Sequence, residues 1–256
     1  MNLQQTRWLE HFRRNRLNRP EPSWQAPVDL PPDQIRPLLR SLEQFQLGDG
    51  GGPAYLIAWN RDAWLDRVPS RRELVDLWFE EEKEHSRLLG CAVDRFGGRP
   101  VDGHWSFSVF CAVRRWGGVG FELTALLLTE ISATVYYQLL ERHVKDPAIR
   151  AMSRLIIRDE AAHIAFHRER LVLPGVAGRR HYGRTWETWF RVLGLAAGTM
   201  LWINHRPALV ASGATTMEFY RELWKQTSGF ITRLRRELYA RPSADLDLLG
   251  DFLDAK

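Results

Sequence analysis

The stretches Glu82-Lys83-Glu84-His85 and Glu160-Ala161-Ala162-His163 decide the fold that this sequence predicts. Both have the form Glu-x-x-His and lie in strongly helical surroundings. Residues three apart project from the same side of a helix, so each stretch directs a carboxylate and an imidazole to one point. Glu130, an acid within an apolar helical stretch, lies between the two in sequence. Four-helix bundles that hold two iron or manganese ions are built from such parts.

A metal site in a bundle requires that its ligands lie on the helix faces that point inward. Three expected helices meet this requirement, because each carries acids or histidines within an apolar row. The rows are Trp78, Glu82, His85 and Leu89; then Leu123, Leu127, Glu130, Thr134 and Tyr137; then Ile156, Glu160, His163 and His167. A salt bridge or local exposure could explain any one of these acids. Together they favour a pair of divalent cations, which removes the cost of burying unpaired carboxylates.

The sixth ligand should come from the helix that begins near Asp33, and here the sequence leaves alternatives open. Asp49 continues a sevenfold inward row with Ile35, Leu42 and Leu56, whereas Glu43 lies one step off that row. In an antiparallel helix pair, a ligand as far from the end of one helix as Glu82 is from the start of the other lies opposite it. This rule also selects Asp49. The surrounding glycines form helix poorly, so Asp49 could instead lie in a loop at the helix end. Asp49 is therefore the first choice, Glu43 the second, and no ligand from this helix the third.

This layout resembles the ferritin-like di-iron carboxylate superfamily. The stretch Glu81–Leu89 looks like the first metal motif of the soluble acyl-carrier-protein desaturases, and Arg158–His163 looks like their second. The resemblance covers about residues 33–171. It implies that Asp159, which precedes the second motif, hydrogen-bonds His85 and orients that ligand. His167, one turn beyond His163, could be an extra ligand, a proton shuttle or a packed core histidine, and we favour the last. Tyr137 could touch the site, but we favour a core role for it too.

Helical patterns cover most of the chain, and no convincing strand pattern occurs. We predict an all-α fold: a ferritin-like four-helix bundle with an N-terminal helix and two extra C-terminal helices. The expected organisation is an N-terminal helix and proline-rich strap over residues 1–32, the bundle over 33–172, and C-terminal helices packed on it over 173–256. The helices are expected at Gln4–Leu17, about Asp33–Trp59, Ser70–Phe96 with a Ser70/Glu73 capping box, Trp105–Arg115, Val119–Val144, Pro147 to before Pro174 with Asp146 as N-cap, Thr185–Asn204 and Thr215–Ala240.

The composition, 45% apolar and 26% charged, is that of an ordinary globular protein. The two cysteines, Cys91 and Cys111, are too few for a disulfide scaffold and are expected to be core thiols of a cytoplasmic protein. No secretory signal is expected, and the most apolar helical segment expected, Val192–Ile203, is too short to span a membrane. The net charge is +5, and only four of the 36 basic residues are lysine. No nucleic-acid motif accompanies this charge, so no nucleic-acid partner is expected.

Four carboxylates and two imidazoles balance the charge of two divalent ions, and oxygen-rich ligand sets favour iron, or manganese, over zinc. We therefore expect an oxidoreductase that uses O₂ to oxidise a small organic or carrier-bound substrate, with an external electron donor. Apolar residues, among them Trp78, Trp105, Phe107 and Trp116, could line its substrate pocket or simply pack in the core. The alternatives are a ferritin- or rubrerythrin-like protein that oxidises iron or removes peroxide, and a non-catalytic helical module with a vestigial site. Similar bundles are commonly dimers, so a homodimer is one expected state.

Overall fold

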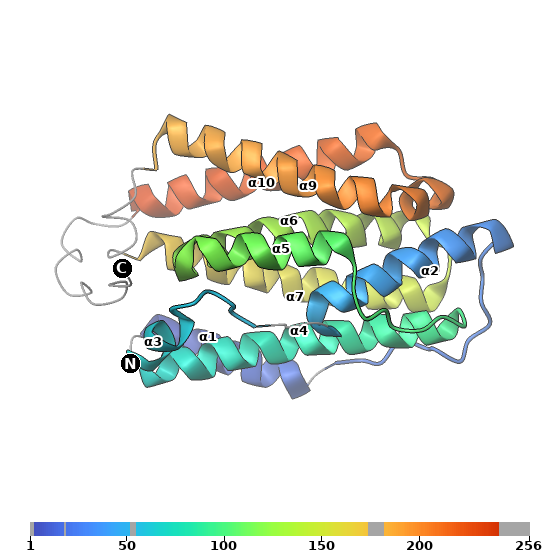
Figure 1. Cartoon of the computed structure of the whole chain (residues 1–256), viewed down its shortest axis with the longest axis horizontal. Coiled ribbons are helices and arrows are strands. Elements are labelled where there is room, and N and C mark those ends of the chain that lie inside the picture. Colours follow the sequence, from blue (N-terminus) through green and yellow to red (C-terminus); the bar gives the residue numbers. More distant parts are fainter. Residues whose placement is uncertain (1–2, 18, 52–54, 174–181, 241–256) are drawn as a thin grey trace.

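A computed structural model describes residues 3–17, 19–51, 55–173 and 182–240. These residues form nine α-helices and one π-helical turn, with no strand among them, so the all-α bundle is confirmed (Figure 1). In chain order the elements are α1 (Leu3–Leu17), α2 (Pro32–Gln46), η1 (Leu47–Gly51), α3 (Arg61–Asp66), α4 (Pro69–Arg95), α5 (Trp105–Trp116), α6 (Gly118–His143), α7 (Pro147–Val172), α9 (Arg184–Ser212) and α10 (Thr216–Ala240).

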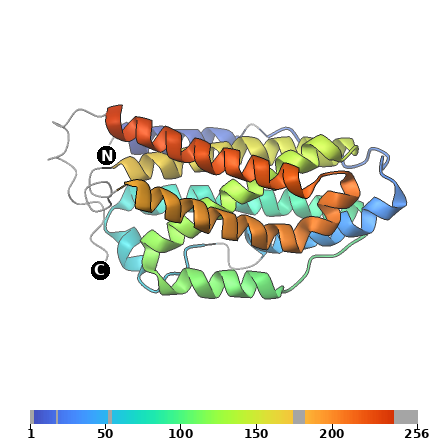
Figure 2. The same cartoon turned by 90° about the horizontal axis from the view of Figure 1, so that it is seen from above.

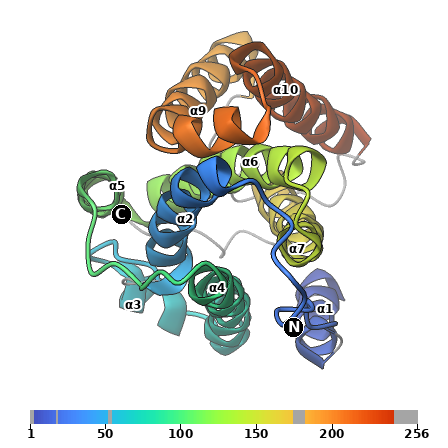
Figure 3. The ribbon, with the colours of Figure 1, turned by 90° about the vertical axis from the view of Figure 1, so that its right-hand side faces the viewer.

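Four helices, α2, α4, α6 and α7, form the central bundle, in which α2 packs on α4 and α6 packs on α7. The pair α9 and α10 covers the bundle on the α6 side (Figure 3). Helix α1 packs on α4 at the opposite side, and α5 stands at one edge, where it contacts α6 (Figure 2). The division into three domains proposed above remains a prediction.

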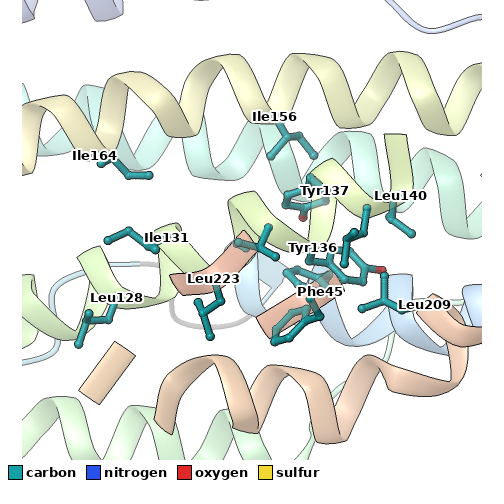
Figure 4. Close-up of a cluster of buried hydrophobic side chains, with 14 of the residues drawn as sticks. Phe45, Leu128, Ile131, Tyr136, Tyr137, Leu140, Ile156, Ile164, Leu209 and Leu223 are labelled. Atoms are coloured by element: carbon teal, nitrogen blue, oxygen red, sulfur yellow. The ribbon is translucent and has the colours of Figure 1, made fainter. Parts of the chain in front are cut away.

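The main apolar core runs through the bundle and into its contact with the α9–α10 pair (Figure 4). Phe45 stacks on Tyr136 with ring centroids 4.1 Å apart, and both side chains are buried. At the same point Ser41 Oγ lies 2.6 Å from Tyr136 Oη and 2.9 Å from His205 Nδ1. These buried polar contacts connect α2, α6 and α9. Specific hydrogen bonds as well as apolar packing therefore hold α9 against the bundle.

The helix expected to run from Asp33 through Trp59 is shorter than predicted. Helix α2 ends at Gln46 and passes into the π-helical turn η1, within which Gly50 has a φ of +137°. Leu56 is buried outside any helix, and Trp59 is 75% exposed. The glycines around Asp49 cannot sustain an α-helix, and only glycine adopts the backbone conformation of Gly50 readily.

Two helix ends also differ from the prediction. Helix α4 begins at Pro69 with Val68 as N-cap, so the Ser70/Glu73 capping box is wrong, and Glu73 instead pairs with Arg13 of α1. Helix α9 continues past Asn204 and through Pro207 to Ser212, where Ala208 and Leu209 are buried. Burial of these side chains offsets the backbone hydrogen bond that a proline inside a helix cannot make. The expected cap at Asp146 is confirmed, because its side chain accepts from the amides of Ala148 and Ile149.

By length and composition α6 could cross a membrane, and 61% of its most apolar window is buried within the molecule. A core helix of a bundle passes the same test. Both cysteines, expected in the core, are only half-buried free thiols.

Candidate metal centre

Three helices and the turn η1 bring the predicted metal ligands together inside the bundle. Helix α4 supplies a Glu-x-x-His pair, α7 supplies the second pair, α6 supplies a carboxylate, and η1 ends beside them. Within each pair the three-residue spacing places the two side chains on one helix face. The residues in question are Asp49, Glu82, His85, Glu130, Glu160 and His163.

The ligand atoms form two groups, and within each group all the atoms lie within 4.8 Å of one another. One consists of Glu82, His85 and Glu160, and the other of Glu82, Glu130 and His163. Glu82 belongs to both groups. Glu160 also reaches both imidazoles, because its Oε1 lies 3.7 Å from His85 Nδ1 and its Oε2 lies 3.6 Å from His163 Nδ1. The buried cluster could therefore hold metal at two neighbouring positions that share two carboxylates.

Asp49 reaches the cluster from η1, as the first choice for the sixth ligand requires. Tyr137 Oη donates a hydrogen bond of 2.9 Å to Asp49 Oδ2, and Asp49 lines one cavity together with Glu82, Glu130 and Glu160. Gly50 allows this approach, because a Cβ there would lie 3.3 Å from both Lys83 Cα and Ser86 Cβ of α4. Glu43 lies on α2 beside Gly98 and does not line the cavity.

An acid of the other motif contacts each candidate histidine ligand at the ring nitrogen that faces away from the cluster. His85 Nε2 lies 3.2 Å from Asp159 Oδ2, which is the contact predicted for Asp159. His163 Nε2 lies 2.9 Å from Glu81 Oε2. Since an ionised carboxylate can only accept, Nε2 of each ring carries the proton and Nδ1 faces the carboxylates. Sequence reasoning missed Glu81, although it precedes the first motif as Asp159 precedes the second.

The end of α1 and the residues after it bind both of these outer acids. Arg19 lies 2.9 Å from Glu81 Oε1 and 2.7 Å from Asp159 Oδ2, and its side chain is only 11% exposed. Asn15 Nδ2 donates to Asp159 Oδ1 at 2.8 Å and also to Glu81. The N-terminal segment thus covers the back of the cluster and partly neutralises its two outer acids.

The inward atoms of the cluster have no hydrogen-bond partners among the residues that the structure describes. They are Glu82 Oε1, His85 Nδ1, both oxygens of Glu130, Glu160 Oε2 and His163 Nδ1. His163 Nδ1 and Glu82 Oε1 approach to 3.0 Å, but not with hydrogen-bond geometry. Buried polar atoms are nearly always paired, so this concentration indicates an absent partner common to all of them. A metal ion fits, because every one of these atoms is a nitrogen or oxygen ligand.

The electrostatics of the cluster support the same conclusion. Burial raises the pKa of Glu130 to about 8, that of Asp49 to about 8 and that of Glu160 to about 7. Contacts with His163 and His85 outweigh the opposing effect of burial and lower the pKa of Glu82. Contacts with carboxylates likewise outweigh burial and raise the pKa of both imidazoles. Without metal, the cluster can share protons to limit its charge, and divalent cations could replace those protons.

His167, one turn beyond His163 on α7, is fully buried at the edge of the cluster. Its Nε2 lies 3.3 Å from Glu130 Oε1, and its ring meets Trp78 edge-on at a centroid distance of 5.0 Å. Burial lowers its pKa well below the ordinary value. This neutral histidine contacts a predicted ligand and packs in the core, so its place agrees with the sequence-based expectation of a residue beside the ligands.

A cavity of about 960 Å³ opens directly onto the cluster. Its walls come mainly from α5, α6 and α9, with residues of α2, η1, α4 and α7, and they are mostly aromatic and aliphatic. Trp78 and Phe107 line it as the sequence suggested, whereas Trp105 and Trp116 do not and are 55% and 86% exposed. Two of the four apolar residues named from the sequence therefore line an apolar cavity, and the other two lie on the surface.

The fold and the cluster define this chain as an all-α helical bundle with a buried carboxylate–histidine site. No family model, no curated protein and no solved structure matches it.

Proposed function

We propose that this chain is a ferritin-like di-iron protein that uses O₂ to oxidise an organic substrate. One iron would be held by Asp49, Glu82, His85 and Glu160, and the other by Glu82, Glu130, Glu160 and His163. This assignment follows the two groups of ligand atoms, which share Glu82 and are spanned by Glu160. Oxygen donors outnumber nitrogen donors in both, which favours iron, with manganese as the alternative, over zinc.

The observation that carries an oxidase or oxygenase is the apolar cavity beside the carboxylates. Its volume, about 960 Å³, is at the upper end of the range for pockets that enclose small organic molecules, about 300–1,000 Å³. Two ferrous ions can together supply two electrons to O₂, and an external donor would restore them. The apolar walls would bind the substrate and keep water away from the reacting atoms.

The protein's own contribution is the placement of its ligands and protons. Glu81 and Asp159 hold the imidazoles with Nδ1 inward. Tyr137 fixes one oxygen of Asp49, which leaves the other free to face the cluster. Such outer contacts set the orientation and basicity of metal ligands.

Metal analysis of anaerobically purified, iron-reconstituted protein tests the proposal. We expect two irons per chain and an absorption band that develops only after O₂ is added. Alanine at Glu82, His85, Glu130, Glu160 or His163 should halve or abolish iron binding with helical content retained. Glu80→Ala on the same helix is the matched control, because the Glu80 side chain is 47% exposed and pairs with Lys83. Two irons in both the His85 and His163 variants would refute the di-iron proposal.

The same preparation separates the alternatives. A ferritin- or rubrerythrin-like protein would go on oxidising iron well beyond two ions per chain, or would consume peroxide without an organic substrate. A non-catalytic module would remain free of metal after reconstitution. The cavity favours the oxidase, since neither iron storage nor peroxide removal needs an apolar pocket of this size.

A further inference from the structure

The mouth of the cavity is rimmed by apolar side chains that are also open to solvent. Val109 and Val113 of α5, Phe121 of α6, and Leu193 and Met200 of α9 all line the cavity. Their exposed fractions lie between 38% and 50%. A soluble enzyme with a polar substrate would gain nothing from such a rim, because exposed apolar patches generally mark a contact with another apolar surface.

The rim continues along α9 as an exposed apolar row. Trp189, Leu193, Ala196, Met200 and Ile203 are spaced by four, three, four and three residues, so they share one face of the helix. Trp189 is 62% exposed and Ile203 is 59% exposed. The row covers about 21 Å of the helix at 1.5 Å per residue.

Helix α5 carries a matching row on its side of the mouth. Trp105, Val109, Ala112 and Trp116 are spaced by four, three and four residues, and all are exposed. We call the two rows together the mouth face: Trp105, Val109, Ala112, Val113 and Trp116 of α5, and Trp189, Leu193, Ala196, Met200 and Ile203 of α9. Residues of both helices line the cavity, and α5 stands at the outer edge of the molecule (Figure 2, Figure 3).

The charges on these two helices are almost entirely positive. Helix α5 contains no acid, and its exposed charge is Arg115. The single acid of α9, Glu187, is 12% exposed and lies within 3.5 Å of both Arg191 and Arg235. Arg184 and Arg206 of α9 are exposed. Asp102, in the segment before α5, is the nearest exposed acid along the chain to that helix.

We propose that the mouth face docks on an anionic lipid surface, from which an apolar substrate enters the cavity. The proposal rests on the proposed function insofar as the cavity takes an organic substrate. Tryptophan is favoured at the boundary of a bilayer, apolar side chains enter it, and nearby arginines are attracted to anionic headgroups. Docking of the rim would give an apolar molecule a path to the carboxylates that avoids water.

Pairing of the mouth face with a second copy is less favourable on the same evidence. In a two-fold dimer the same patch faces itself, so both copies would bring to the interface helices whose exposed charges are arginines. Neither α5 nor α9 offers an exposed acid to pair with them. A lipid surface with negative headgroups supplies the missing charge.

Co-sedimentation with vesicles tests the proposal, with the full chain in both metal-free and iron-loaded form. The vesicles are phosphatidylcholine alone and phosphatidylcholine mixed with phosphatidylglycerol. We expect binding to the mixed vesicles, weakened by salt, and about tenfold or more weaker binding for Trp189→Ser/Ile203→Ser. Trp224→Ser is the matched control, since Trp224 of α10 is 61% exposed, contacts Arg191 and does not line the cavity. It should bind as the wild type does, with equal helical content and thermal stability in every variant.

Three outcomes would overturn the proposal: no binding to the mixed vesicles, equal loss in the double variant and the Trp224 control, or a dimer in solution that only the double variant dissociates. Because vesicle binding is measured without metal, its failure is distinct from failure of the proposed function. Iron loading without vesicle binding refutes the lipid contact alone, and vesicle binding without iron loading refutes the di-iron proposal alone.

Discussion

Single residues decide which nitrogen each histidine turns toward the candidate metals. Asp159 and Glu81 accept from Nε2 of His85 and His163, and Asn15 and Arg19 hold these two acids in place. The cross-pairing means that neither motif is complete without the other. A substitution of the acid in one motif should therefore weaken metal binding by the histidine of the other motif.

Replacing Asp159 by Asn or Glu81 by Gln should weaken iron binding by about 10–100-fold, because the amide no longer stabilises a basic, correctly oriented imidazole. Titration with a competing chelator measures the change. Glu84→Gln is the control on α4, since Glu84 pairs with the exposed Arg87. Wild-type affinity in both variants would mean that the two acids act only in packing.

Asp49→Ala should reduce iron binding, whereas Glu43→Ala should leave it unchanged. Asp49 lines the cavity beside Glu82 and Glu160 and binds Tyr137, but Glu43 faces Gly98. Iron stoichiometry of the two purified variants decides between them. Equal loss from both, or loss from Glu43→Ala alone, would reject Asp49 as the sixth ligand.

Iron affinity should rise with pH across the neutral range. Burial raises the pKa of Glu130 and Asp49 to about 8, so near neutral pH these carboxyls hold protons that a metal must displace. The folding stability of the metal-free protein should instead fall as the pH rises. A carboxyl whose pKa is raised from 4.5 to about 8 on folding contributes stability below 4.5 and loses that contribution as the pH rises toward 8.

Chelator competition at several pH values, with proton release followed in weak buffer, measures the first effect. Thermal unfolding of metal-free wild type and Glu130→Gln measures the second, and the wild type should show the larger loss of stability toward pH 8. An iron affinity that is constant across the neutral range would contradict the assignment of Glu130 as a ligand.

At the scale of secondary-structure elements, short irregular segments matter as much as the long helices. The turn η1 delivers Asp49 because Gly50, with its φ of +137°, lets the backbone lie against α4. The start of α7 is set by Asp146, which is fully buried and also pairs with Arg95 of α4 at 2.7 Å. That one carboxylate ties together two of the helices that carry the metal site.

Asp146→Ala should lower the free energy of unfolding by roughly 3–5 kcal/mol, because it removes a helix cap and leaves Arg95 without its buried partner. The Arg95 side chain is only 3% exposed. Chemical denaturation measures the loss, and the exposed neighbour Asp94→Ala is the control. A loss below about 1 kcal/mol would show that the carbonyls of Trp24, Ala26 and Pro27 satisfy Arg95 without Asp146.

At the scale of the whole molecule, the helices outside the bundle create the cavity. Helices α5 and α9 close space beside α6 that a bare four-helix bundle would leave open to solvent. The candidate metal site therefore lies in the bundle, while the substrate site that we propose lies between the bundle and its additions.

Filling the cavity should separate these two sites. Ala197 of α9 lines the cavity, and Leu195→Phe, at an exposed position of the same helix outside the cavity and the mouth face, is the matched control. Ala197→Phe should weaken binding of the apolar dye anilinonaphthalene sulfonate by about tenfold, since a clash in a filled pocket costs roughly 1–3 kcal/mol. Iron loading should be unaffected. Equal dye binding in Ala197→Phe and Leu195→Phe would place the dye site elsewhere.

Helices α4, α6 and α7 and the faces that they turn inward could be predicted from the sequence, because helix periodicity is local and a three-residue spacing suffices to pair Glu with His. The sequence also placed Asp159 behind His85, through a resemblance to a known family. It did not reveal η1, the pairing of Glu81 with His163, the cover formed by Asn15 and Arg19, or the cavity. Each of these depends on how helices distant in sequence cross and which residues then meet. That register is a property of the packed molecule, and local sequence patterns do not encode it.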